Sequence, residues 1–362
     1  MNKKELYIGV MSGTSLDGVD IALCEIDSST CSLTHYNEYP FPTQLKESIL
    51  NAISTPLTLQ SMGELDHKLG ALFAECINEF ILTHKLNTQS INAIGLHGQT
   101  LWHAPDGGTP FSMQLGDANI VASRTAIQTI ADFRRMDIAN GGQGAPFAPA
   151  FHKFLFAHLE EKVAVLNIGG MANITILDEE VLGWDSGCGN VLLDYWMSQT
   201  QLKPYDKDGE FACIGTIHKE LLALMLSDAY FKKEAPKSTG REYFNGHWLE
   251  EKLSSFSNIS EQDVQRTLLE LTAKSISNDL INRDTKKLVV CGGGAKNIFL
   301  MQRLKELGCC KIKSSDDFGV NSNALEAMAF AWFAYKRSHG EVVNLCSITG
   351  AKKPSQLGAI YG

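Results

Sequence analysis

Three glycine-rich turns have the composition of phosphate-binding loops. They lie at 13–18 (GTSLDG), 169–173 (GGMAN) and 292–297 (GGGAKN). Glycine lets backbone N–H groups converge on a polyanion, because it tolerates positive φ angles and close approach. One such turn alone is equally compatible with a tight hairpin, but three are more than packing requires. The set predicts a site for nucleotide phosphates.

These turns do not match the familiar phosphate motifs. A Walker A loop needs Lys after its second glycine, whereas Gly18 is followed by Val19. A dinucleotide fingerprint needs a third glycine where the last turn has Asn297. The chain also has no GxSxG nucleophile elbow. P-loop, Rossmann and serine-hydrolase interpretations are therefore weak.

One carboxylate, Asp185, lies among glycines at 183–190, just before a helical pattern that starts near Asn190. Phosphoryl transfer depends on positioning and on a residue that orients or deprotonates the nucleophile. Asp185 suits that role. The alternative is that Asp185 only caps the turn or the helix, and spacing alone favours the cap.

Two polar segments, 95–100 and 114–117, can line a sugar pocket, since sugar hydroxyls are recognised by hydrogen-bonding side chains in clefts. The first segment contains His97 and Gln99. His97 on its own is more often a hydrogen-bonded structural histidine. Both residues are candidates for substrate binding.

Two charged residues complete the candidates. Arg134 can place a planar cation near a phosphate or a sugar carboxylate, or can form a surface ion pair with Asp132 or Asp137. Glu326 is an isolated acid in an apolar helical pattern, where it either faces a cleft or lies on the solvent-exposed side of the helix.

The surrounding elements predict an α/β fold. Short β-type runs precede the glycine turns at 7–10, 163–168 and 288–291, and the third turn leads into a helix. Further helices are expected at roughly 43–53, 59–85, 189–201, 216–227, 261–282 and 322–337. Strands and helices therefore interleave. The Gly- and Pro-rich segment 139–149 is either a crossing between lobes or an active-site loop within one lobe.

The bulk composition narrows the function. A length of 362 residues favours two domains. A net charge of -9 and a pI near 5.6 oppose binding to nucleic acid or anionic membranes. The nine cysteines form no CxxC pair, and no signal segment or apolar run of about 18 residues is present. These features predict a cytoplasmic protein that binds neither nucleic acid nor membrane.

Several long motifs resemble the anhydro-N-acetylmuramic acid kinases. They are GVMSGTSLDGVD at 9–20, LHGQT at 96–100, GDAN at 116–119, ADFRRMDIANGGQGAPF at 131–147, NIGGMANIT at 167–175, DSGCGN at 185–190, PKSTGREYFN at 236–245 and CGGGAKN at 291–297. The matches span nearly the whole chain. Members of that family commonly carry Pro where this chain has Cys188.

The resemblance implies the fold of the actin, hexokinase and Hsp70 class. This is a two-lobe actin-like (ribonuclease H-like) ATPase fold, with the active site in the interlobe cleft. We expect lobes at 1–140 and 141–362, with a terminal helix that can pack back on the first lobe. The resemblance implies ATP contacts from three turns: Gly13, Thr14, Ser15, Leu16, Asp17, Gly18, Val19 and Asp20; Gly169, Gly170 and Asn173; and Gly292, Gly293, Gly294 and Asn297.

The same resemblance implies a reaction. ATP and water would convert 1,6-anhydro-N-acetylmuramic acid to N-acetylmuramic acid 6-phosphate in peptidoglycan recycling, with Asp185 as the base and Arg134 and Glu326 as substrate-side partners. Mg²⁺ is implied, but its ligands stay open, because Met11 stands where many of the class carry an Asp. A homodimer is expected. An ordinary hydroxyl-directed sugar kinase and an actin-like nucleotide-binding protein are the alternatives.

Overall fold

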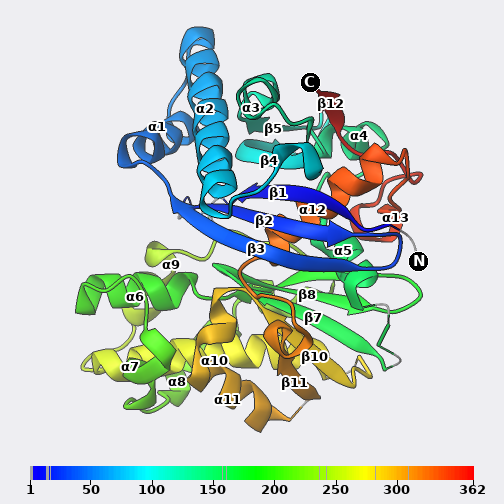
Figure 1. The fold of residues 1–362 in the computed structure, drawn as a ribbon. Coiled ribbons are helices and arrows are strands. Elements are labelled where there is room, and N and C mark those ends of the chain that lie inside the picture. Colours follow the sequence, from blue (N-terminus) through cyan, green and yellow to red (C-terminus); the bar gives the residue numbers. More distant parts are fainter. Residues whose placement is uncertain are drawn as a thin grey trace. The chain divides into compact units, whose positions relative to one another are not determined.

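The computed structural model describes residues 3–362 apart from 14, 15, 17, 157, 160, 236, 242, 282 and 309. The chain forms two compact units (Figure 1). Unit 1 contains Met1–Leu155 and Ala324–Gly362, and unit 2 contains Phe156–Asn323. Each unit has its own sheet and its own apolar core. Within the described part of the chain, no helix combines the length and apolar character needed to cross a membrane.

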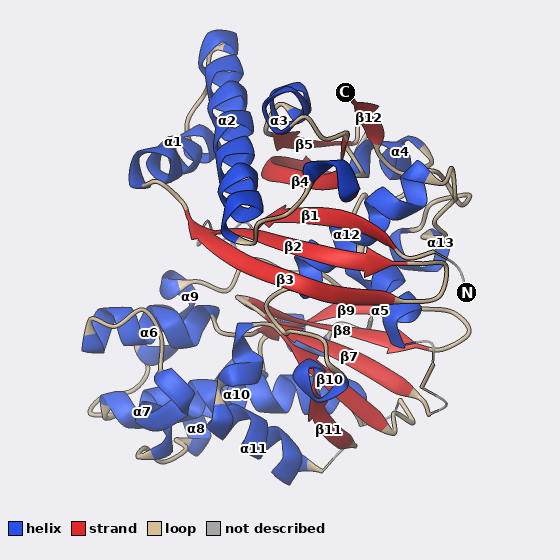
Figure 2. Ribbon diagram, in the orientation of Figure 1, coloured by secondary structure: helices blue, strands red, loops and turns tan. Residues whose placement is uncertain are grey.

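Unit 1 is built on a seven-stranded sheet with helices around it (Figure 2). Its strands are β1 (Glu5–Ser12), β2 (Gly18–Ile26), β3 (Cys31–Pro40), β4 (Ile91–Ala104), β5 (Phe111–Leu115), β6 (Thr129–Ala131) and β12 (Ala359–Tyr361). Its helices are α1 (Thr43–Ser54), α2 (Leu59–Thr83), α3 (Ala118–Thr125), α4 (Arg134–Ala139), α5 (Ala148–Phe156), α12 (Leu325–Ser338) and α13 (Cys346–Thr349).

Unit 2 is built on a five-stranded sheet. Its strands are β7 (Val163–Ile168), β8 (Met171–Leu177), β9 (Leu182–Cys188), β10 (Lys287–Cys291) and β11 (Lys311–Ser314). Its helices are α6 (Val191–Gln201), α7 (Glu210–Cys213), α8 (Lys219–Leu226), α9 (Gly246–Leu253), α10 (Glu261–Leu280) and α11 (Ile298–Leu307). Helix α10 is the central helix of this unit: it packs on β8 and β9, and α6, α7, α8 and α11 pack on it.

The two sheets share one topology. In unit 1, β1, β2 and β3 form an antiparallel meander, and β4 and then β6 join the other side of β1 in parallel. In unit 2, β7, β8 and β9 form the meander, and β10 and then β11 join the other side of β7 in parallel. This repeated order confirms the predicted two-lobe, ribonuclease H-like α/β fold.

Helix α12 packs directly on the sheet of unit 1, because two glycines leave the strands beneath it without side chains at the points of contact. A Cβ on Gly9 of β1 would lie 1.8 Å from the carbonyl oxygen of Ala327. A Cβ on Gly95 of β4 would lie 2.0 Å from that of Phe330. The helix backbone therefore touches the strand backbone, which fixes the height of α12 above the sheet.

The boundary between the units differs from the expected one at 140. The segment 139–149 lies wholly in unit 1, where Asp137 accepts a hydrogen bond from Gly144 N at 2.7 Å and Gln143 N donates to Thr349 O at 2.9 Å. Those bonds hold the segment as a loop of unit 1 rather than a crossing. Residues 324–362 also belong to unit 1, through the packing of α12 on β1 and β4.

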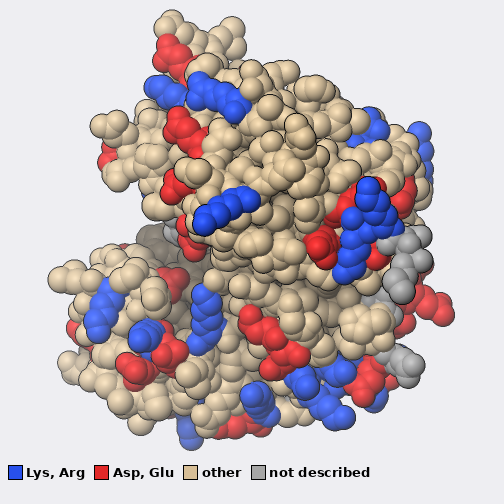
Figure 3. Space-filling view, in the orientation of Figure 1, with Lys and Arg blue, Asp and Glu red and all other residues tan. Residues whose placement is uncertain are grey.

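Charged side chains of both signs intermingle on the face shown in Figure 3. Lysines and arginines there alternate with acids instead of forming one continuous basic area.

Candidate functional site

The first glycine turn joins β1 to β2. Thr14, Ser15 and Asp17, three of its expected ATP contacts, lie outside the described residues. Leu16 is buried with a φ of 56°, and its N–H donates to Gly13 O at 3.2 Å. Val19 is also fully buried. These two side chains anchor the turn in the core, so at both positions only the backbone is left to meet a nucleotide.

The side chain of Gln99 on β4 holds the start of this turn through two hydrogen bonds. Its side chain is buried, its Oε1 accepts from Ser12 Oγ at 2.5 Å, and its Nε2 donates to Gly13 O at 3.4 Å. The last residue of β1 and the first residue of the turn are therefore tied to β4. The structure places Gln99 as a brace of the first glycine turn.

Arg134 and His97 form the centre of the polar site in unit 1. Arg134, the first residue of α4, reaches His97 Nε2 with Nη2 at 2.8 Å and with Nε at 3.3 Å. Its third contact is from Nη1 to Gly144 O at 2.8 Å. The ion pair with Asp132 that the sequence allowed for Arg134 is made instead by its neighbour Arg135, at 3.5 Å.

The charge state of His97 follows from these contacts. Burial and the adjacent Arg134 lower its pKa to about 3, so the imidazole is neutral near pH 7. Because Nε2 accepts from a guanidinium, which cannot itself accept, the ring proton belongs on Nδ1. Burial also lowers the pKa of Arg134 to about 10, against the opposing attraction of Glu326 and Asp137. Arg134 remains a cation at neutral pH.

Glu326 lies in the first turn of α12, on the same unit as this cation. Solvent reaches its side chain, yet protein surrounds it enough for desolvation to raise its pKa, while the charge of Arg134 acts in the opposite direction. The ring of Phe330, one turn further along α12, packs 4.7 Å from the ring of His97. Sequence-predicted residues of β4, α4 and α12 thus come together in unit 1.

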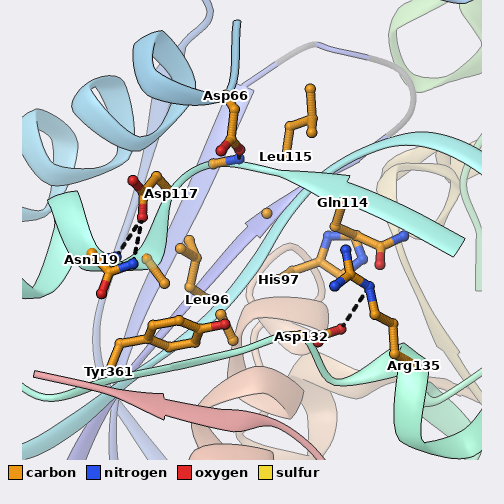
Figure 4. Close-up of a pocket in the computed structure, with 14 residues that line it drawn as sticks. Asp66, Leu96, His97, Gln114, Leu115, Asp117, Asn119, Asp132, Arg135 and Tyr361 are labelled. Carbon is orange, nitrogen blue, oxygen red and sulfur yellow. Dashed lines mark hydrogen bonds and ion pairs between the residues drawn. The ribbon is translucent and has the colours of Figure 1, made fainter. Parts of the chain in front are cut away.

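A pocket opens beside His97, midway along β4 (Figure 4). Its volume is about 180 Å³. The two polar segments considered for a sugar pocket both contribute to its wall, through residues 96–98 and 114–117. The acids Asp66, Asp117 and Asp132 and the hydroxyl-bearing Tyr361 also line it. Arg135, which pairs with Asp132, lines it as well. The pocket is therefore polar, a lining suited to hydroxyl groups.

In unit 2, Asp185 lies within strand β9 rather than in a turn. Its backbone N–H donates to Lys237 O at 2.9 Å, and its carboxylate Oδ2 accepts from Thr239 N at 3.0 Å. Helix α6 begins at Val191 with Asn190 as its N-cap residue. The capping role that spacing favoured for Asp185 is therefore not the one observed: its carboxylate is held by the segment around 239.

Asn173 on β8 pairs directly with Asp185 on β9. Directly opposed residues of an antiparallel pair project to the same face, with Cβ atoms about 4.5–5.5 Å apart. A residue expected to bind ATP is thereby placed beside the expected catalytic carboxylate.

The second glycine turn is the tip of the β7–β8 hairpin, next to this pair. Gly169 O accepts from Asn190 N at 2.8 Å, and Gly170 O accepts from Gly189 N at 2.9 Å. The carbonyl groups of the tip thus accept hydrogen bonds from the residues that precede α6. Among the described residues, no acceptor is recorded for the N–H of Gly170. This donor is suited to an oxyanion such as a phosphate.

The third turn packs against the end of β7. Gly292 has a φ of 79°, and a Cβ there would lie 2.3 Å from Asn167 Oδ1. A Cβ on Gly294 would lie 2.3 Å from Ile168 Cγ2. Asn167 and Ile168 directly precede the second turn, so these two glycine turns lie together. Asn297 uses its side-chain oxygen to cap α11, accepting from Leu300 N at 2.9 Å.

Residues 5–362 match the family model described as anhydro-N-acetylmuramic acid kinase. The chain belongs to this family. Among its kinases, the protein of Sulfurimonas denitrificans is 54% identical, over 99% of both chains. The Pasteurella multocida kinase is 49% identical, over 98% of this chain and 96% of its own, and the Vibrio vulnificus kinase is 48% identical, over 100% and 99%. The resemblance drawn from the motifs is confirmed.

Sequence reasoning missed the segment that holds the family's expected base in place. Lys237 O and Thr239 N both bond to Asp185, and Lys237 Nζ forms a buried ion pair with Asp279 at 3.1 Å. Asp279 also accepts from Trp184 Nε1 at 2.8 Å. The available signal was the motif at 236–245, which carried the resemblance without a role assigned to any of its residues.

Proposed function

We propose that this chain is a kinase that uses ATP and water to convert 1,6-anhydro-N-acetylmuramic acid to N-acetylmuramic acid 6-phosphate. The match to the family over residues 5–362 supports this activity. The observation that carries the catalytic part is the placement of Asp185 beside Asn173 and the two adjoining glycine turns of unit 2. A carboxylate next to a phosphate site is what a kinase needs to activate its nucleophile.

Asp185 is proposed as the general base. It takes a proton from the water that attacks C1 of the sugar; the C1–O6 bond of the anhydro bridge breaks, and O6 attacks the γ-phosphorus while the bond to ADP breaks. The base must be ionised at the start. The N–H of Thr239, which donates to Oδ2 at 3.0 Å, orients the carboxylate.

Arg134 and Glu326 are proposed to bind the sugar. Arg134 offers a cation for the lactyl carboxylate of a muramic acid, and neutral His97 holds that cation in place. Glu326 offers an acceptor for a sugar hydroxyl or amide. We assign Gln99 an indirect role through the first glycine turn, consistent with its burial and its bonds to Ser12 and Gly13.

The nucleotide is proposed to enter as its Mg²⁺ complex. Mg²⁺ commonly keeps several waters and binds through one or two carboxylates plus substrate phosphates. The described residues contain no group of three or more His, Cys, Asp or Glu side chains arranged for a metal. We further propose a cytoplasmic homodimer that acts in peptidoglycan recycling.

The deciding experiment measures ADP release with 1,6-anhydro-N-acetylmuramic acid, N-acetylmuramic acid or glucose as acceptor. We expect turnover on the anhydro sugar only, and a loss of at least about 1,000-fold in Asp185→Asn, since a base contributes about 10²–10⁴-fold and the amide cannot replace it. Asp178→Asn, in the exposed turn after β8, is the matched control and should keep full activity. Turnover on N-acetylmuramic acid or glucose would instead identify a hydroxyl-directed sugar kinase.

A further inference from the structure

Arg241 lies against the second glycine turn of unit 2. A Cβ built on Gly170 would lie 3.6 Å from Arg241 Nη2 and 3.7 Å from Nε. Those two nitrogens belong to one edge of the guanidinium, so the planar fork lies against the tip of the hairpin. The N–H of Gly170, for which the described residues supply no acceptor, lies in this tip.

The guanidinium of Arg241 has no partner among the described residues, unlike the other arginines of unit 2. Arg266 and Arg303 both pair with Glu270, and Arg283 lies over the ring of Trp184 at 4.9 Å. Arg241 is exposed, and none of the ion pairs or ring contacts of the described chain involves it. A guanidinium and a backbone N–H that lie together, with no acceptor among the described residues, are hydrogen-bond donors suited to binding an anion.

The segment that carries Arg241 is anchored rather than loose. Lys237 is buried and paired with Asp279, and its carbonyl accepts from Asp185 N. Two residues further on, Thr239 N donates to the Asp185 carboxylate. The same short segment, 237–241, therefore holds the proposed base and presents the arginine.

We propose that Arg241 is a phosphate-binding residue that contacts the transferred γ-phosphoryl group of ATP together with the N–H of Gly170. This assignment rests on the proposed function, because the position of Asp185 in the same segment is what selects the transferred group over the other phosphates. A guanidinium there offsets the charge on the phosphoryl oxygens and aligns them relative to the base.

The test compares Arg241→Gln and Arg241→Lys with wild type. Lys219→Gln, which removes one exposed cation from α8 of the same unit, is the control for net charge. Calorimetric titration at fixed ionic strength gives the Kd of ATP, ADP and AMP without any sugar, and the coupled assay gives kcat. Thermal unfolding shows that each variant is folded.

We expect Arg241→Gln to raise the Kd of ATP by about 10-fold or more, to change the Kd of ADP and AMP by less than about 3-fold, and to lower kcat by about 100-fold or more. Arg241→Lys should recover part of the loss, since Lys keeps the charge but not the fork. Unchanged ATP affinity and kcat in Arg241→Gln, or equal losses for ATP, ADP and AMP, would overturn the assignment.

Failure of this proposal is distinguishable from failure of the proposed function. A wild-type protein that does not turn over the anhydro sugar refutes the function. Selective loss of ATP affinity in Arg241→Gln would still support the phosphate contact, because that measurement contains no sugar.

Discussion

Gly9→Ala should separate α12 from the sheet of unit 1 and thereby displace Glu326, one of the residues proposed to bind the sugar. The added Cβ would lie 1.8 Å from Ala327 O and 2.6 Å from Ala331 N. Ordinary contact begins near 3.4 Å, so helix and strand must part by about 1.6 Å at this point. Both clashing atoms are backbone atoms, and no side-chain rotation can relieve the contact.

Two effects follow, and both can be given a size. Overpacking of this kind costs about 1–3 kcal/mol, and the upper end applies because the clash is with backbone. For a unit of this size, about 3 kcal/mol corresponds to a fall of roughly 6–12 °C in Tm. Glu326 moves with α12, and a misplacement of about 1 Å can lower turnover by about 100-fold.

Thermal unfolding and the ADP-release assay measure the two effects. The control is Gly63→Ala in α2, where an added Cβ meets nothing within 4 Å. That variant should keep its activity and gain about 0.5–1 kcal/mol, because alanine is the better helix former. A Gly9→Ala protein with wild-type Tm and wild-type turnover would refute the reasoning that backbone contact fixes the position of α12.

Three further outcomes are expected. Lys237→Met should lower the free energy of unfolding by about 3 kcal/mol in urea titrations, because it leaves the partly buried Asp279 without its cation. A second change, Asp279→Leu, should restore part of the loss. The pKa of His97 is 6.5 in the unfolded chain and about 3 in the fold, so the stability that the neutral ring contributes is complete above pH 6.5 and is lost as pH falls toward 3. In His97→Gln, the fall of the unfolding free energy with decreasing pH should be shallower by up to about 1.4 kcal/mol per pH unit. An unchanged pH dependence would contradict the neutral histidine. The pKa of Glu326 is raised in the fold, so the ionised carboxylate lowers the stability of the fold as pH rises. Glu326→Gln should therefore raise Tm at pH 8, and it should also raise the KM for the sugar. A Tm below that of wild type would contradict the destabilising effect of the ionised carboxylate.

The sequence was most informative where a pattern is local. Helices expected at 59–85 and 261–282 are observed as α2 (Leu59–Thr83) and α10 (Glu261–Leu280), because apolar periodicity and end signals act within a few turns. The third glycine turn joins a strand to a helix as predicted. The α/β class followed from the same local evidence.

Long-range pairing decided what the sequence could not show. Asp185 read as a turn residue because glycines surround it, but β9 pairs with β8 and the residue is extended. The polar atoms of Gln99 resemble those of a ligand residue, yet they bond to β1, which is 87 positions away at Ser12. The boundary expected at 140 differs for the same reason, because the bonds that hold 139–149 in unit 1 are long-range, whereas the terminal helix expected to pack back on the first lobe is observed as α12.

The discontinuity of unit 1 affects the order in which the protein can fold during synthesis. Unit 2 is one continuous segment, Phe156–Asn323, and can close its core as soon as it leaves the ribosome. Unit 1 must wait, because α12, which covers β1 and β4, is translated after all of unit 2. Until then β1 and β4 are uncovered on that face, and a nascent chain in this state is exposed to mispairing and chaperone capture.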